Sequence, residues 1–168
     1  MFEQLRKCGI ASKDNINSVI PDPNRRQEKG YVIIECYQEI PCDPCVAACP
    51  KKAIKPMSNI NETPIADLNI CDGCGLCIAL CPGLAIFAVD ETREDYAILK
   101  IPHEFNPPAK GDIVEALGRD GKIMAKVEVD RVIRTKSKTS VVWLRIKDRE
   151  LLQDIRAIKP SLPFKEEL

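Results

Sequence analysis

Eight of the nine cysteines in this chain occur in two segments with nearly the same spacing. The second segment, residues 71–82, has the sequence CDGCGLCIALCP. The first, residues 42–50, has the sequence CDPCVAACP and is preceded by Cys36. The spacing C-x2-C-x2-C-x3-C-P, complete in the second segment, is a ligand pattern for iron–sulfur clusters, because thiolates are soft donors that match iron and sulfide. These residues predict one-electron transfer rather than bond-making by side chains.

Three cysteines at this spacing can hold three corners of a cluster from one tight loop, so the fourth corner must be reached from elsewhere. The last cysteine of each segment follows a short helical turn that would direct it at the other cluster. We therefore expect two [4Fe-4S] clusters whose ligands cross over between the segments. Cluster 1 would be held by Cys36, Cys42, Cys45 and Cys81, and cluster 2 by Cys71, Cys74, Cys77 and Cys49.

The first segment departs from the regular pattern, because five residues separate Cys36 from Cys42. Cys36 can complete cluster 1 only if residues 37–41 bulge outward as a loop. Two alternatives stay open. One is a cluster that lacks one iron. The other is a carboxylate ligand from Glu39, which occupies the position that regular spacing would give to a cysteine.

Other chemistry is weakly represented in the sequence. Paired C-x2-C motifs also bind zinc, but zinc ribbons lack a four-cysteine string followed by proline, so iron and sulfide are favoured. His103 is the only histidine, and in its proline-rich stretch we expect it to be exposed or to make a contact. No catalytic residue is expected. We expect Cys8 to be a reduced, partly buried structural thiol, and Trp143 to belong to a β core.

The composition limits which other classes of protein this chain could belong to. The 168 residues suffice for one ordinary domain or two small ones. Residues 1–108 carry 11 lysines and arginines against 15 acidic residues, and residues 109–168 carry 14 against 10. Such mild imbalances do not favour nucleic-acid binding. The N-terminal residues show no apolar run typical of a signal peptide, and no stretch approaches the length of a membrane span, so we expect a cytoplasmic protein with reduced thiols.

The pattern of strands and breakers divides the chain into five parts. We expect an N-terminal arm over 1–30 with irregular backbone at 21–30, a two-cluster unit over 31–101, a proline-rich linker over 102–110, a small all-β domain over 111–158 and a tail over 159–168. Within the two-cluster unit, strands are predicted at 31–34, 86–89 and 96–101, with a hairpin between 53–54 and 65–67. Alternating apolar residues predict further strands at 112–117, 123–133, 140–146 and 154–158, with an Asp-Gly turn at 118–121.

The motifs at residues 42–54 and 71–86 resemble those of the bacterial two-[4Fe-4S] ferredoxin family, over about residues 31–90. The resemblance implies an α+β fold with a pseudo-twofold repeat, in which two clusters lie between a small sheet and two short helices. The stretches at 35–45 (ECYQEIPCDPC) and 102–107 (PHEFNP) are similar to ferredoxin-like subunits of multicomponent flavin-dependent dehydrogenases. This second resemblance implies a flavoprotein partner.

The expected fold class is therefore α+β: a ferredoxin-type two-cluster unit followed by a small, barrel-like antiparallel β domain. The expected function is a non-catalytic subunit that relays single electrons between a flavin-containing partner and another acceptor. The arm, the linker and the β domain add more chain than a free electron carrier needs. Because these segments lack catalytic residues, docking to a partner is their simplest role. The alternatives are an independent ferredoxin that the β domain stabilises, or a redox-sensing or nucleic-acid-binding module.

Overall fold

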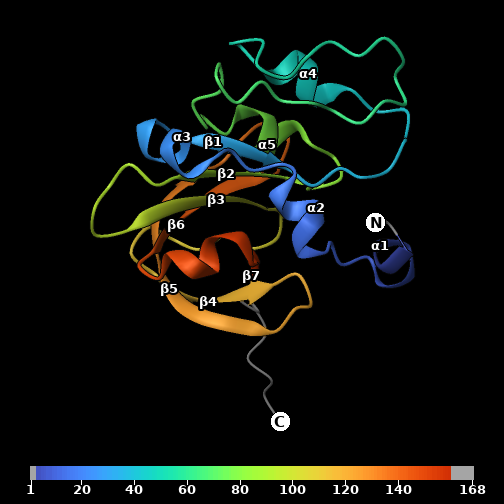
Figure 1. Ribbon diagram of the computed structural model, residues 1–168. Coiled ribbons are helices and arrows are strands. Elements are labelled where there is room, and N and C mark those ends of the chain that lie inside the picture. Colours follow the sequence, from blue (N-terminus) through green and yellow to red (C-terminus); the bar gives the residue numbers. More distant parts are fainter. Residues whose placement is uncertain (1–2, 160–168) are drawn as a thin grey trace.

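A seven-stranded, entirely antiparallel sheet dominates the computed structural model, which describes residues 3–159. The strand order is β1-β2-β3-β6-β5-β4-β7, and Figure 1 shows how the sheet curls with short helices around it. The strands are β1 (Tyr31–Ile34), β2 (Ile86–Asp90), β3 (Ala97–His103), β4 (Ile113–Gly118), β5 (Ile123–Ile133), β6 (Ser140–Ile146) and β7 (Ile155–Ile158). The helices are α1 (Glu3–Cys8), α2 (Lys13–Asn17), α3 (Pro23–Glu28), α4 (Pro44–Ala48), α5 (Leu76–Leu80) and the 3-10 helix η1 (Arg149–Gln153).

The expected fold class is wrong. A ferredoxin-type α+β unit with a separate barrel-like domain is not formed, because one curled sheet runs through both parts. Strand β3 makes the connection: it pairs with β2 on one side and with β6 over all seven of its residues on the other. Pro102 lies beyond the last pair with β2, which joins Ala88 to Lys100, so its missing N–H does not interrupt that ladder.

Individual strands follow the alternation in the sequence closely. β5 and β6 have the predicted bounds, and β1 pairs with β2, with Tyr31 opposite Val89. The predicted hairpin is reduced to one isolated bridge between Ile54 and Ala66. The residue boundaries of the five predicted parts stay a prediction, and residues 160–168 of the predicted tail lie outside the described residues.

The N-terminal arm is more regular than expected. Residues 21–30 were expected to be irregular, but Asp22 caps α3 by accepting hydrogen bonds from the N–H groups of Asn24 and Arg25. Pro23 opens this helix, where its missing N–H has no helical partner to lose. Ser12 and Asn15 form a reciprocal capping box at the start of α2. Local side-chain hydrogen bonds therefore define these helices.

The sheet has apolar residues on both faces at its β1–β2 end. Tyr31 and Ile33 point into the inner core, which extends along the curled sheet to β7. Val32 and Ile34 point to the opposite face, where a second core, the outer core, packs against the cysteine segments. Successive side chains of β1 point to opposite faces of the sheet. The strand therefore packs both against the inner core and against the loops that carry the cysteines.

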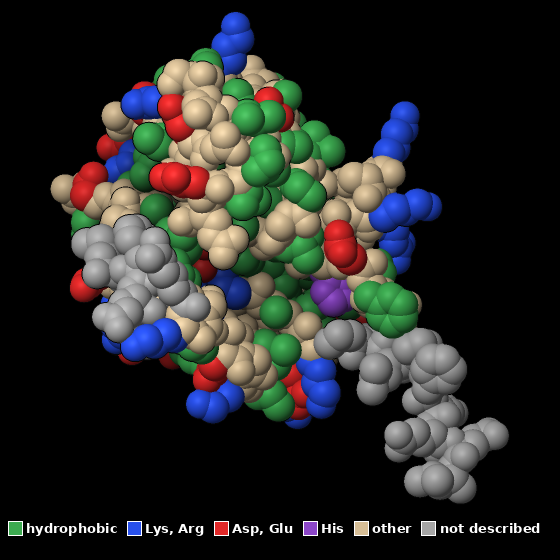
Figure 2. All heavy atoms as spheres, turned by 90° about the vertical axis from the view of Figure 1, so that its right-hand side faces the viewer, with side chains coloured by type: hydrophobic (Ala, Val, Ile, Leu, Met, Phe, Trp, Pro, Cys, Tyr) green, Lys and Arg blue, Asp and Glu red, His purple; other side chains and the backbone are tan. Residues whose placement is uncertain are grey.

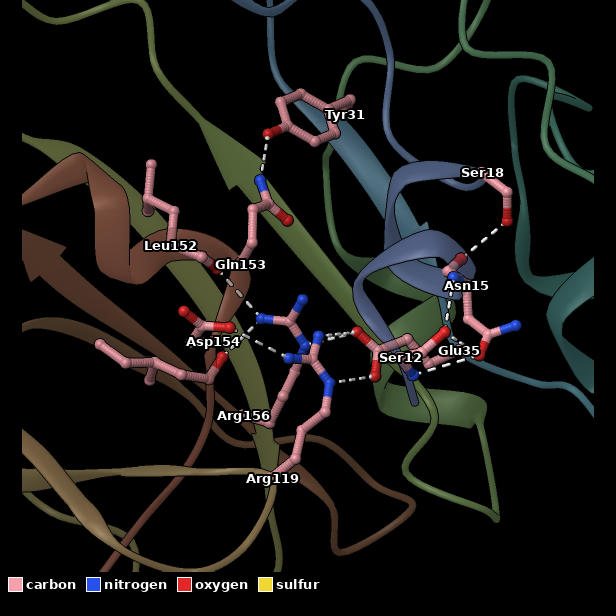
Figure 3. A network of polar contacts seen from close by, with 11 residues as sticks. Ser12, Asn15, Ser18, Tyr31, Glu35, Arg119, Leu152, Gln153, Asp154 and Arg156 are labelled. Atoms are coloured by element: carbon pink, nitrogen blue, oxygen red, sulfur yellow. Dashed lines mark hydrogen bonds and ion pairs between the residues drawn. The ribbon is translucent and has the colours of Figure 1, made fainter. Parts of the chain in front are cut away.

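Side chains connect the two edge strands, β1 and β7. Glu35, directly after β1, accepts hydrogen bonds from Arg156 Nε of β7 at 2.6 Å and from Arg119 Nε at 2.9 Å (Figure 3). Burial alone would raise the pKa of Glu35, but the hydrogen bonds and charges of the two arginines outweigh it and lower that pKa. Nearby, Gln153 Nε2 donates to the Tyr31 hydroxyl. The network therefore fixes the backbone immediately before Cys36.

Candidate metal centre

The two cysteine segments meet through α4 and α5, which are in contact with each other. Cys45 in α4 and Cys77 in α5 are buried in the outer core beside Ile78. Cys49 and Cys81 follow these helices as C-terminal caps. The pattern C-x3-C-P thus places equivalent cysteines at equivalent points of two neighbouring helical turns.

The two Cys-Pro turns also share their hydrogen bonding. The N–H of Ala53 donates to Cys49 Sγ at 3.2 Å, and the N–H of Ala85 donates to Cys81 Sγ at 3.4 Å. In each turn the residue before the alanine has a positive φ, 54° in one and 51° in the other. Such N–H groups orient a thiolate ligand and stabilise its negative charge.

The four cysteines predicted for cluster 2 line one small cavity. Three come from the second segment and one from the first: Cys71, Cys74, Cys77 and Cys49. Burial, followed by the charges of the other three cysteines, raises the pKa of Cys77 to about 12. Four sulfurs from two segments around one cavity are a donor set that fits an iron–sulfur cluster, since metal binding deprotonates buried thiols.

Glycine is required at the centre of the Cys71–Cys77 loop. Gly73 has a φ of +65°, and a Cβ added there would lie 2.7 Å from the backbone nitrogen of Tyr31. This close approach lets the N–H of Gly73 donate to Cys71 Sγ at 3.3 Å. The loop backbone therefore packs directly on the start of β1, which a side chain would prevent.

A buried arginine holds the same loop from the other side. Arg25 of α3 donates to four backbone carbonyls: those of Leu68, Lys29, Gly30 and Cys71. These hydrogen bonds join α3 to the residues just before β1 and to the segment that leads into the cysteine loop. Sequence reasoning missed Arg25, because nothing in the polar stretch around it distinguishes one arginine from the next.

The cysteines predicted for cluster 1 influence one another electrostatically. Burial, followed by the charges of Cys81, Cys42 and Cys36, raises the pKa of Cys45 to about 11. Burial also raises the pKa of Cys36, followed by the charges of Cys81 and Cys42. Glu39 is exposed. The arrangement thus associates Cys81 of the second segment with the first segment, as the crossing assignment requires.

The eight cysteines form no disulfide. Within residues 3–159, no group of three or more histidine, cysteine, aspartate or glutamate side chains converges as a single metal ion would require. A zinc ion draws its sulfur ligands to about 2.3 Å, whereas the ligands of a cluster surround a larger inorganic core. Four of the eight, Cys49, Cys71, Cys74 and Cys77, line one small cavity.

Three other residues were singled out by the sequence. His103 was expected to be exposed or to make a contact; it is buried, and within residues 3–159 its Nε2 has no hydrogen-bond partner. Cys8 was expected to be partly buried, and it is exposed. Trp143 packs with the outer core beside the cysteine segments, below Lys100 and Arg131, and does not belong to the inner core of the sheet.

Comparisons with protein families, curated proteins and solved structures found no match to this chain. Across residues 3–159, every helix is too short or too polar to cross a lipid bilayer. The functional argument for this protein therefore depends on its own residues and their geometry.

Proposed function

We propose that this protein holds two [4Fe-4S] clusters and serves as an electron-transfer subunit of an oxidoreductase. Cluster 1 would be bound by Cys36, Cys42, Cys45 and Cys81, and cluster 2 by Cys71, Cys74, Cys77 and Cys49. The cavity that Cys49 shares with three cysteines of the other segment carries this proposal. When bound, the clusters supply reversible one-electron transfer.

The residues of the chain hold the clusters and shield them. Cys45 and Cys77 are buried between the outer face of the sheet and the two short helices, which excludes water from one side. The backbone N–H groups of Gly73, Ala53 and Ala85 stabilise sulfur charge. These residues move no proton and make no bond to a substrate, so the protein acts as a relay.

A flavin-containing partner would dock over the exposed side of the cysteine segments. Cys74 is exposed, and Leu76 and Leu80 of the adjoining helix are 54% and 48% exposed. Figure 2 shows hydrophobic side chains gathered over the upper part of one face, the height at which Figure 1 places α4 and α5. Apolar surface beside an exposed ligand suits close approach of a second redox group.

Anaerobic purification tests cluster binding directly. The expected result is a brown protein with about eight irons and about eight sulfides per chain. A colourless protein that contains zinc instead would overturn the proposal. Purification from the native host under argon then tests the partner: a flavoprotein should accompany the chain, and a cluster-loaded monomer that accepts electrons alone would identify an independent carrier.

A further inference from the structure

Lys100 is a buried positive charge beneath the cysteines of cluster 2. It lies in the middle of the apolar strand β3 and is only 5% exposed. Its neighbours Leu99 and Ile101 enter the inner core, so alternation directs Lys100 to the opposite face, which carries the cysteine segments. Its partner across the strand pair with β6 is Trp143, which packs with the outer core.

The contacts of Lys100 suit a charged ammonium group. Its Nζ donates a hydrogen bond to the carbonyl of Gly73, between Cys71 and Cys74, and lies 4.1 Å from the ring centre of Trp143. A Cβ added at Gly75 would lie 3.5 Å from Lys100 Cδ, so this side chain packs under the loop. A carbonyl oxygen and an aromatic face both stabilise a cation without neutralising it.

No carboxylate among residues 3–159 is within ion-pair distance of Lys100. The nearby Asp72 pairs with Lys51 at 2.7 Å, and this pair is at the surface. Burial lowers the pKa of Lys100, and the charges of Asp90, Cys74 and Asp72 oppose that decrease. For Cys36 and Cys45 of cluster 1, the charges with the largest effect are those of other cysteines. An unneutralised cation therefore lies close to one cysteine set.

We propose that Lys100 raises the reduction potential of cluster 2 above that of cluster 1. This inference rests on the proposed function. A cluster becomes more negative when it gains an electron, so a fixed positive charge in a medium of low dielectric stabilises the reduced form. With both clusters bound, a single electron would therefore reside preferentially on cluster 2, the cluster that the positive charge of Lys100 favours.

The test is an EPR-monitored redox titration of the full cluster-loaded chain and of K100M, which keeps length but removes charge. We expect at least a tenfold decrease in the reduction equilibrium constant of cluster 2, about 59 mV for a one-electron couple. The potential of cluster 1 should change by less than a third of that amount. K100R, which restores the charge, should return the potential of cluster 2 toward the wild-type value.

Lys51 provides the matched control, because it lies beside the same loop but is exposed and paired with Asp72. K51M should shift the potential of cluster 2 by less than K100M does, because Lys51 is exposed and water and salt screen its charge. C74S, which exchanges one sulfur ligand for oxygen, identifies the signal of cluster 2. If K100M binds less iron than wild type, K100Q, which retains an N–H donor for the Gly73 carbonyl, gives the same comparison.

Two results would overturn the role of Lys100: equal shifts of both clusters in K100M, or no shift in a variant with full iron content. A wild-type protein that binds no iron and sulfide would instead overturn the proposed function. The two failures are therefore distinguishable in the same set of samples.

Discussion

The two cysteine loops use the same ligand type but differ in how the protein holds them. The regular loop, Cys71–Cys77, is fixed from three sides, by Arg25, by Lys100 and by the close approach of Gly73 to β1. The widened loop between Cys36 and Cys42 is held at its two ends, by Glu35 and by the N–H of Cys42, which donates to the carbonyl of Ile60, and its residues 38–41 are exposed. Preorganised ligands lose little conformational entropy on binding, whereas a mobile loop loses more.

The difference leads to a general expectation for this molecule. Cluster 2 should be the tightly held group, and cluster 1 should depend on how the loop after β1 is ordered. Each of the following variants disturbs one loop while leaving the other intact, and together they test whether the contrast is real.

Loss of a ligand should give the largest effect. C77A should reduce the iron content from about eight to about four per chain, because cluster 2 loses a buried ligand. C36A should likewise lower the iron content, through cluster 1. E39A is the control for the widened loop and should retain all of the iron, as measured by iron and sulfide analysis.

The iron counts also decide between the alternatives for the widened loop. Full iron content in C36A would contradict the assignment of Cys36 as a ligand. Iron loss in E39A would show that a carboxylate completes cluster 1. About seven irons in the wild-type protein, with no change in C36A, would indicate a cluster 1 that lacks one iron.

Removal of the Glu35 carboxylate should give the next largest effect. E35A leaves Arg119 and Arg156 buried without their shared acceptor, and breaking a buried ion pair costs about 3–5 kcal/mol. Urea unfolding of the cluster-loaded protein under argon measures this loss. The control is E115A, whose partner Lys159 is exposed, with an expected cost of at most about 1 kcal/mol. Equal costs would show that the edges of the sheet are not joined at Glu35.

The bounds of individual strands could largely be predicted from local sequence. The pairing between strands that are distant in the sequence was missed. The bounds of β5 and β6 follow from alternation of apolar residues, which each strand carries by itself. The fold class was wrong because it depends on β3 continuing through Pro102 and pairing with β6, a contact between distant segments. A strand was predicted at 96–101, but the last two residues of β3, Pro102 and His103, were assigned to the linker because of the prolines.

In the candidate site, too, local features could be predicted from the sequence and long-range contacts could not. The cysteine spacing predicted that Cys49 lies with three cysteines of the second segment, and these four line one cavity. The set of four for cluster 1 stays a prediction. The residues that hold the loops were missed: Glu35 meets Arg119 and Arg156, which lie 84 and 121 positions away in the sequence. Lys100 had a visible signal, since a lysine in the middle of an apolar strand has to be exposed or to find partners.

The regular loop is tested by the close contact at Gly73. G73A introduces a methyl group against the backbone of β1 at a positive φ, and we expect a loss of about 3 kcal/mol in unfolding free energy. The matched control is G111A, where φ is also positive, +89°, but nothing lies within 4 Å. It should lose only about 1 kcal/mol. Similar losses in both variants would mean that the loop does not pack on β1 as described.

The smallest expected effect is the part of the pH dependence that Glu35 contributes, directly before the widened loop. The arginines lower the pKa of Glu35 in the folded protein below its ordinary value of 4.5. The stabilisation is present above that value and is lost as the pH falls toward the folded-state pKa, because the unfolded chain takes up the proton first. The free energy of unfolding should therefore decrease on acidification, and E35Q should remove part of that decrease.

Urea unfolding at pH 7 and at pH 4 measures this contribution. The change in unfolding free energy between the two pH values is compared among wild type, E35Q and E39Q, the last being a control at an exposed residue. E39Q should keep the wild-type dependence. If E35Q keeps it as well, the two arginines do not stabilise the ionised carboxylate, and the loop before Cys36 is not anchored by charge. If E35Q flattens the dependence and also loses iron from cluster 1 before cluster 2, the edge network both closes the sheet and orders the fourth ligand.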